Sequence, residues 1–376
     1  MPKIPTFVQI CFEEQIKHTM TVTPYSSGYR MPAEWETHSA TQLHWPSNRE
    51  TWPGERLQKA EEVYLDIIEV LHRYEPVILL IDTAIEINHV QHRLKSRKID
   101  TGKLHLYHIA INDVWARDCG PIFVKNAQGL HTEFAITNWG YNAWGGKYPP
   151  YDADNALPAW FAETFGLKKF DAGMILEGGS IDTNGEGVFL TTESVLLNQN
   201  RNPHLTKPEI ESYLKNYLGA EQIIWLKEGL KGDDTDGHID DLSRFLNHNT
   251  ILTMVCEDQK DVNYAALNEN LEILKQAKQR NGDPFHILTL PLPLTEIDGL
   301  TADGSQYVPA SYANFYIANG VVLVPLYDDR YDDVALKILG KHFPERDIAG
   351  IPCADLVWGQ GSIHCITQQL YGLNID

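Results

Sequence analysis

Residues 55–81 read ERLQKAEEVYLDIIEVLHRYEPVILLI, and this stretch holds the pattern that decides the fold. Its apolar side chains recur at roughly helical spacing, with charged residues filling much of the rest: Leu57, Val63, Leu65, Ile68 and Leu71. This spacing predicts an amphipathic helix. The run PVILLI follows at once and includes β-branched residues, so it predicts a buried strand.

The same alternation continues along the chain without a long linker. Strand-like runs lie at 103–109, 187–192, 222–226, 250–255, 285–290 and 320–326, and helical patterns lie at 206–218, 262–279 and 330–343. Thr206 suits the N-cap of the first of these helices, and Pro208 suits its first turn. The alternation predicts an α/β protein. Since no repeat of fixed period occurs, any internal symmetry must be structural.

Composition narrows the class of protein. The 376 residues are 43% hydrophobic and 22% charged, as in ordinary soluble globular proteins. The 31 basic and 51 acidic residues give a net charge of −20, which opposes binding to nucleic acid or anionic membranes and attracts cations. Solubility alone would explain this charge equally well. We therefore expect no nucleic-acid partner and no membrane partner.

Cysteine usage points to a reducing compartment. Five cysteines are present, namely Cys11, Cys119, Cys256, Cys353 and Cys365. Their odd number, wide spacing and lack of a C-x-x-C pair disfavour a disulfide framework or a cysteine-rich zinc site. We expect reduced thiols and a cytoplasmic location. Residues 1–20 do not resemble a signal peptide, and we expect them to be a poorly ordered extension before a single catalytic domain, 21–376.

Three polar clusters follow strand-like runs. The first, NDVWARDCGPIFV at 112–124, carries Trp115, Arg117 and Asp118, and alone it favours an Arg–Asp ion pair that caps a turn. The second, ILEGGSID at 175–182, places Glu177 before two glycines, which would let the backbone approach a ligand or would simply form a turn.

The third cluster, KGDDTDGHIDDLSRF at 231–245, concentrates negative charge. Its titratable residues are Asp233, Asp234, Asp236, His238, Asp240 and Asp241. Such a concentration is costly unless a cation is present. From this segment alone, a solvated loop ranks first, a cation site second and a metal site last, because no H-E-x-x-H motif occurs in the chain.

The C-terminal stretch GQGSIHCITQQ, residues 359–369, supplies a nucleophile behind a glycine-rich turn. Deimination of a guanidinium group needs a thiolate, carboxylates that hold the planar cation, and an acid/base. Cys365, Asp118, Asp240 and His238 supply these types, with a carboxylate to spare. A serine mechanism is less attractive, because no G-x-S-x-G elbow occurs.

Taken together, the segments resemble the agmatine deiminases of the guanidine-modifying (pentein) superfamily. The resemblance runs from about residue 29 to 369 in the segments YRMPAEWE, WARDCGP, NWGYNAWGG, LEGGSI, RNPHLTKPEIE, GDDTDGHID, ASYANFYIANG and IHCITQQ. It implies an α/β propeller of five ββαβ-type units around a central site. It also implies no organic cofactor and no metal.

The resemblance also implies roles for individual residues. The nucleophile falls on Cys365, the acid/base on His238 and the guanidinium-holding carboxylates on Asp118 and Asp240. The tail of the substrate is expected near Trp115, Glu177 and Asp234.

Two departures from the family pattern concern the substrate. Gln360 interrupts what is usually a run of glycines, and Asp236 and Asp241 replace asparagines of many relatives. Agmatine is the expected substrate, with free or peptidyl arginine as the alternative, because the site segments offer only Arg117 and Arg244 to clamp a carboxylate. An amidinotransferase, an inactive guanidine-binding module and a metal-dependent hydrolase are further alternatives. The oligomeric state, including a homo-oligomer, stays open.

Overall fold

The computed structural model describes residues 22–375 apart from 86, 298, 302 and 328. The expected N-terminal extension, 1–20, and Cys11 lie outside these residues. Within the described part of the chain, no helix is long and apolar enough to cross a membrane.

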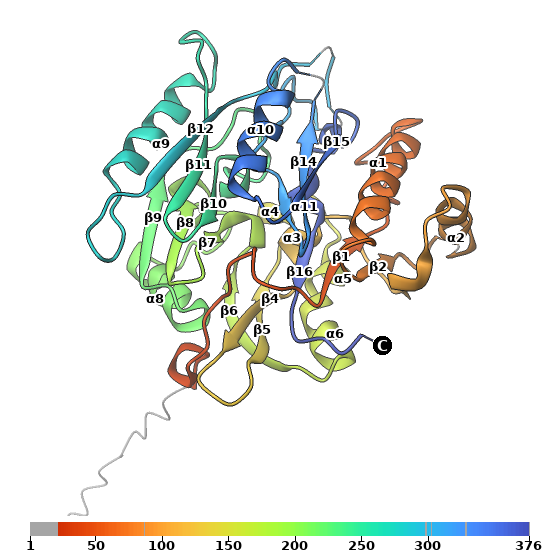
Figure 1. Cartoon of the computed structure of the whole chain (residues 1–376), viewed down its shortest axis with the longest axis horizontal. Helices are drawn as coiled ribbons and strands as arrows, with labels where there is room; N and C mark the ends of the chain where they lie inside the picture. Colours follow the sequence, from red (N-terminus) through yellow and green to blue (C-terminus); the bar gives the residue numbers. More distant parts are fainter. Residues whose placement is uncertain (1–21, 86, 298, 302, 328, 376) are drawn as a thin grey trace, which may run out of the picture.

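The architecture is a ring of five small sheets, each built in the same way (Figure 1). In one unit, β4 (Ile122–Asn126) pairs antiparallel with β5 (Glu133–Gly140). Helix α6 (Leu157–Thr164) then leads to β6 (Lys168–Ile175), which pairs parallel with β5. Each unit thus presents an antiparallel pair and one parallel crossover through a helix.

Three further units repeat this order along the chain. One comprises β7 (Asp182–Thr183), β8 (Val188–Thr192), α8 (Lys207–Leu218) and β9 (Gln222–Leu226). The next comprises β10 (Ser243–Asn247), β11 (Thr250–Val255), α9 (Tyr264–Gln276) and β12 (His286–Pro291). The last comprises β13 (Tyr316–Ile317), β14 (Val321–Leu326), α10 (Asp332–His342) and β15 (Asp347–Pro352). In each, the first two strands are antiparallel and the last two parallel.

The fifth unit joins the two ends of the described chain. Strand β16 (Gln368–Leu370) pairs antiparallel with β1 (Ala40–His44), which continues through α1 (Arg56–Leu71) into the parallel strand β2 (Val77–Ile81). An additional helix, α2 (Ile87–Ser96), and strand, β3 (Leu104–His108), extend this sheet. The predicted propeller of five ββαβ units is confirmed.

Local sequence explains the elements that were predicted. The apolar stripe of α1 is buried, and all five residues of β2 are buried, as expected for a strand covered on both faces. Helix α8 begins with a capping box between Thr206 and Glu209 and ends at Gly219, whose φ of 77° is left-handed. Strands β9 and β11 have the predicted bounds.

The five units position one site because each contributes the segment that precedes its first strand. These segments are α3 (Ala116–Cys119), η3 (Gly178–Ser180), η4 (Ile239–Asp241), the loop 311–315 and α11 (Ile363–Ile366). Helix α3 contacts both α11 and η3, and η3 contacts η4. Residues that are far apart in sequence therefore meet at the centre of the ring.

Candidate active site

Three predicted site residues converge around Gly179, in the segment EGGS. A Cβ atom at Gly179 would lie 2.6 Å from Nδ1 of His238, 2.7 Å from Oδ1 of Asp118 and 3.2 Å from Oδ2 of Asp240. A side chain at this position would displace all three groups. The second glycine of this segment is therefore required by the close approach of the backbone to the site, not only by a turn.

Asp118 is buried and held by two donors. Its Oδ1 accepts from the backbone N–H of Gly179 at 3.0 Å, and its Oδ2 accepts from Nε1 of Trp144 at 3.0 Å. Burial raises the pKa of Asp118 to about 6; His238 and the Trp144 hydrogen bond oppose this rise, whereas the charges of Asp240 and Glu177 add to it. The carboxylate is oriented and is ionised above about pH 6.

An unusual backbone turn delivers the Trp144 indole. Four consecutive residues, Ala143 to Gly146, have positive φ angles of 49°, 54°, 93° and 76°. The left-handed region costs L-residues roughly 1–2 kcal/mol each, so Ala143 and Trp144 are strained while the two glycines are not. The Asn142 side chain caps the turn by accepting from the Gly145 N–H at 2.8 Å. The segment NWGYNAWGG thus supplies the glycines that allow this turn.

His238 lies against Asp118, with Nδ1 3.6 Å from Oδ1 of the carboxylate. It is 1% exposed, and neither ring nitrogen has a hydrogen-bond partner among the described residues. Burial lowers the pKa of His238, but the negative charges of Asp118, Asp240 and Glu177 outweigh it and raise the pKa overall. Two free ring nitrogens at a buried position suit a group that exchanges protons with a bound molecule.

Cys365 is held by Asn314, from the loop before β13. The amide Nδ2 of Asn314 donates to Sγ at 3.2 Å, and its Oδ1 accepts from the backbone N–H groups of His364 and Cys365 at 2.9 and 3.3 Å. Burial raises the pKa of the Cys365 thiol well above its usual value, and the charges of Asp240, Asp241 and Asp118 add to this. A cation beside the thiol would oppose that rise.

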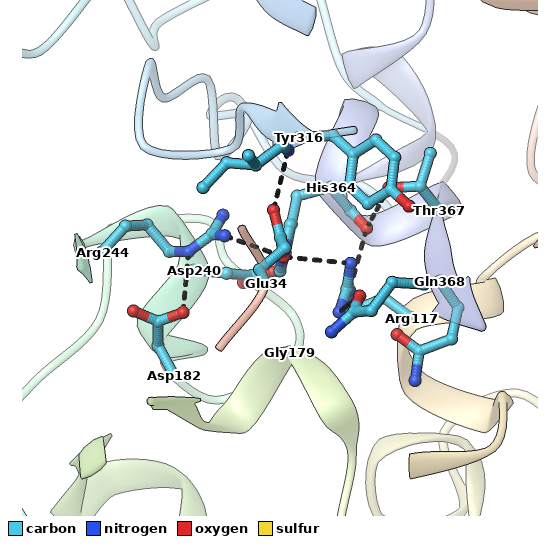
Figure 2. A network of polar contacts seen from close by, with 12 residues as sticks. Glu34, Arg117, Gly179, Asp182, Asp240, Arg244, Tyr316, His364, Thr367 and Gln368 are labelled. Carbon is cyan, nitrogen blue, oxygen red and sulfur yellow. Dashed lines mark hydrogen bonds and ion pairs between the residues drawn. The ribbon is translucent and has the colours of Figure 1, made fainter. Parts of the chain in front are cut away.

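A buried ion network supports Asp240 from behind (Figure 2). Nδ1 of His364 lies 2.6 Å from Oδ2 of Asp240, and Nε2 of His364 lies 2.7 Å from Oε2 of Glu34. Glu34 also pairs with Arg244 at 2.9 Å and with Arg117 at 3.4 Å. Burial raises the pKa of Asp240, but the hydrogen bond and charge of His364 lower it more. Oδ1 of Asp240 keeps no partner among the described residues and is free for a ligand.

The site opens into a cavity of about 610 Å³. The acidic residues that line it are Glu50, Asp82, Asp113, Asp118, Asp154, Asp234 and Asp303, and the basic residues that line it are Arg49 and Lys147. Cys365 and Trp115 also line it, and Trp115 stacks on Trp52 with ring centroids 5.9 Å apart. An acidic, aromatic cavity suits an elongated cation with an apolar middle.

The expected tail residues differ in position. Trp115 and Asp234 line the cavity, and Asp234 Oδ2 accepts from the Tyr148 hydroxyl at 2.6 Å. Burial raises the pKa of Asp234 to about 7. Glu177, in contrast, is 0% exposed and is not among the cavity-lining residues; its Oε1 accepts from Nε of Arg201 at 2.5 Å. His238 and Asp240 are likewise absent from the lining, and Oε2 of Glu177 has no partner among the described residues. Glu177 thus lies behind the cavity, where its charge acts on His238 and Asp118.

Two local interpretations of the sequence were wrong. Arg117 pairs with Glu34 instead of capping its own turn with Asp118. The acidic loop is not simply solvated, because Asp236 pairs with Lys147 at 2.9 Å and with Arg201 at 2.7 Å. The three partners, Glu34, Lys147 and Arg201, lie outside the two segments, so neither segment carries a signal of them.

Several residues of the site were missed. Asn314, Glu34 and Trp144 lie in the segments ASYANFYIANG, YRMPAEWE and NWGYNAWGG, which carry the resemblance but suggested no role for these residues. Tyr148 and Asp303 have no signal in the sequence.

Comparisons with known proteins agree with this geometry. Residues 30–370 match the model of the family described as Porphyromonas-type peptidyl-arginine deiminase. An agmatine deiminase of Ectopseudomonas mendocina is 35% identical over 93% of this chain and 98% of its own.

Solved structures give the same result. The agmatine deiminase of Enterococcus faecalis superposes with a TM-score of 0.84 at 30% identity, over 93% of this chain and 98% of its own. A C. jejuni agmatine deiminase with substrate bound superposes with a TM-score of 0.78 at 33% identity, over 92% of this chain and 97% of its own. The chain therefore belongs to the Porphyromonas-type peptidyl-arginine deiminase family, in the group whose members are named agmatine deiminases.

Proposed function

We propose that this protein hydrolyses agmatine to N-carbamoylputrescine and ammonia. The observation that carries the proposal is the convergence of Asp118, His238 and Asp240 on Gly179, with the Cys365 thiol close by. A planar guanidinium donates to carboxylates in pairs, and Asp118 and Asp240 are the two carboxylates available to receive it. The relatives named above support agmatine as the substrate.

Substrate binding activates the nucleophile in this proposal. Burial and three nearby carboxylates keep the Cys365 pKa high, so the sulfur is a thiol while the site is empty. A bound guanidinium neutralises Asp118 and Asp240, which favours the thiolate. The Asn314 amide then donates to the sulfur anion. The thiolate thus forms next to the carbon that it attacks, and its proton passes to solvent.

The reaction then proceeds in two halves. Sγ of Cys365 attacks the guanidinium carbon, a C–S bond forms, and one C–N bond breaks as His238 protonates the departing ammonia. His238 next takes a proton from water, which attacks the thiouronium carbon. The C–S bond breaks as the sulfur takes the remaining hydroxyl proton and leaves as the thiol, and the carbonyl of N-carbamoylputrescine remains. One water is consumed for each ammonia released.

Free or peptidyl arginine is the second candidate. Arg117 and Arg244, the expected carboxylate clamps, are buried and paired with Glu34. Arg49, however, lines the cavity and is exposed, so it could meet an α-carboxylate at the mouth. Ammonia release from agmatine, arginine and a blocked arginyl peptide tests the choice. Agmatine should have the highest kcat/KM, and a preference for either arginine compound would overturn the proposal.

We also propose that the described chain acts as one catalytic domain in the cytoplasm. The pairing of β16 with β1 supports a single unit, because the two ends of the described chain share one sheet. The free thiols of Cys119, Cys256, Cys353 and Cys365 fit a reducing compartment. Cell fractionation tests the location.

A further inference from the structure

Gln360 occupies a position that ordinarily favours glycine. Its φ of 74° and ψ of 22° are left-handed, which costs a residue with a side chain roughly 1 kcal/mol or more. The flanking positions have no room for a side chain. A Cβ atom at Gly359 would lie 2.5 Å from the Trp52 ring, and a Cβ atom at Gly361 would lie 2.2 Å from the Trp115 ring. Of these three residues, only the middle one can extend a side chain, and the two tryptophans fix the turn beneath it.

The Gln360 side chain points into the catalytic cavity. It is 8% exposed and lines the cavity together with Cys365 and Trp115. Its Nε2 donates to Oδ1 of Asp303 at 3.1 Å. An ionised carboxylate only accepts hydrogen bonds, so this contact sets the orientation of the amide. The carbonyl Oε1 is therefore the end of the amide that remains free.

That free oxygen has no partner among the described residues, although it is buried. An unsatisfied buried acceptor costs about 1–3 kcal/mol, and this cost disappears when a ligand supplies a donor. The left-handed backbone and the unsatisfied acceptor are two separate costs at one residue. Both are explained if Oε1 serves a bound molecule.

The surroundings of Gln360 indicate the chemistry of that donor. Asp303 and Asp234 both line the cavity, and the charge of Asp303 contributes to the raised pKa of Asp234 after burial and the charge of Asp233. Asp303 lies in sequence between Ile297, whose N–H donates to the Gln306 carbonyl at 3.1 Å, and Gln306 itself. One carboxylate that contacts the Gln360 amide and a second that lines the same cavity favour a cation that carries N–H donors.

We propose that Gln360 is a specificity-determining residue, whose Oε1 accepts an N–H of the distal primary ammonium of the substrate. Asp303 orients the amide and contributes negative charge. The inference rests on the proposed function, because it assigns the far end of the same substrate. A carbonyl oxygen would repel an α-carboxylate, and it gains no hydrogen bond from a trimethylammonium group. The residue therefore selects a primary amine over both.

The Gln360→Gly variant tests this inference, since glycine suits the left-handed turn and should preserve the thermal unfolding temperature or raise it. Agmatine and pentylguanidine differ only at the tail, where a methyl group replaces the ammonium. In the variant, kcat/KM for agmatine should fall at least tenfold more than kcat/KM for pentylguanidine, mainly through KM. The wild-type preference for agmatine over its N,N,N-trimethyl derivative should shrink as well.

Gln306→Ala serves as the matched control, because Gln306 is an exposed glutamine close to Asp303 in the sequence. It should leave the ratio of the two substrates unchanged. Equal losses for agmatine and pentylguanidine in Gln360→Gly, or no loss for either, would overturn this inference while wild-type turnover of agmatine still supports the proposed function. No ammonia release from agmatine by the wild type would overturn the proposed function itself.

Discussion

The Trp144 indole N–H donates to Oδ2 of Asp118 at 3.0 Å, from a residue whose φ is 54°. The strained turn and the Asp118 carboxylate are therefore linked by one hydrogen bond. This bond lowers the pKa of Asp118, in opposition to burial, which raises it to about 6. Packing and the Asn142 cap compensate for the backbone strain of the turn. The turn in this way places the Trp144 indole, which holds Oδ2 of Asp118.

Trp144→Phe should move the acidic limb of the pH profile upward. The Asp118 carboxylate must be ionised to hold a guanidinium, so kcat/KM should rise with pH through about 6 in the wild type. Phenylalanine keeps an aromatic ring but cannot donate a hydrogen bond to Asp118, so the pKa of Asp118 should rise. The acidic limb of the profile should then move to higher pH. Trp139→Phe is the control, since its indole donates to the Thr137 hydroxyl at 2.9 Å. An unmoved limb in Trp144→Phe would show that Asp118 does not set it.

Cys365→Ser should abolish turnover without unfolding the protein, because a serine hydroxyl ionises far less readily than a thiol. The matched control is Cys119→Ser. Cys119 is also buried, but its thiol donates to the Trp115 carbonyl at 3.2 Å and is absent from the cavity lining. A cationic haloacetamidine should label Cys365 faster than neutral iodoacetamide does, because only the cation favours the thiolate. Dominant labelling of Cys119 would contradict the assignment.

Asp118→Asn and Asp240→Asn should each lower kcat/KM by about 100-fold or more, because a charged hydrogen bond is lost and an amide N–H₂ then faces a group that only donates. Asp171→Asn, which changes an exposed carboxylate on β6, should have no such effect. Circular dichroism would separate lost catalysis from lost folding. Near-normal efficiency in either site variant would make that carboxylate structural.

Sequence patterns predicted the helix and at least one strand in four of the five units, because each of these has an amphipathic helix beside a buried apolar strand. They did not predict β5, α6 and β6 of the remaining unit. They did not predict strands such as β7 and β13, which have two residues each and depend on their neighbours. In the candidate site, Cys365, His238, Asp118 and Asp240 were singled out because their chemistry is specific and their segments resemble a known family. The structure brings the four together, and their roles stay predictions.

Residues that act through distant partners were not predictable. Glu177 meets Arg201 24 positions away within one unit, and Arg117 meets Glu34 83 positions away in another, and only folding brings each pair together. Tyr148 reaches Asp234 across 86 positions of sequence. No local pattern records such pairs, whereas the interrupted glycine turn at Gln360 was visible at once.

Glu177→Gln should harm agmatine and pentylguanidine turnover equally. Glu177 is buried against Arg201, and breaking a buried ion pair costs about 3–5 kcal/mol of folding free energy. Its charge also raises the pKa of His238, so that pKa should fall in the variant. Chemical denaturation and the pH dependence of kcat would report both effects. A loss confined to agmatine would instead place Glu177 at the substrate tail.

Asp234→Asn should show the opposite selectivity, since Asp234 lines the cavity and can face the distal ammonium. Agmatine should lose about tenfold or more in kcat/KM, as expected for one charged hydrogen bond, and pentylguanidine should lose little. A double-mutant cycle that combines the wild type and Asp234→Asn with agmatine and pentylguanidine isolates the interaction between Asp234 and the substrate tail. Equal effects on both substrates would show that Asp234 supports only the Tyr148 loop.

The pH dependence of agmatine binding gives a test of Asp234 without mutation. Burial raises its pKa to about 7, so in the free enzyme this carboxyl is neutral below that pH and charged above it. The kcat/KM for agmatine should therefore gain a second rise through about pH 7, above the rise that Asp118 produces near 6. Pentylguanidine has no tail charge to attract, so its profile should show only the lower rise. In Asp234→Asn the agmatine profile should lose its upper rise and match that of pentylguanidine. Identical wild-type profiles for the two substrates would mean that the Asp234 charge does not contact the substrate.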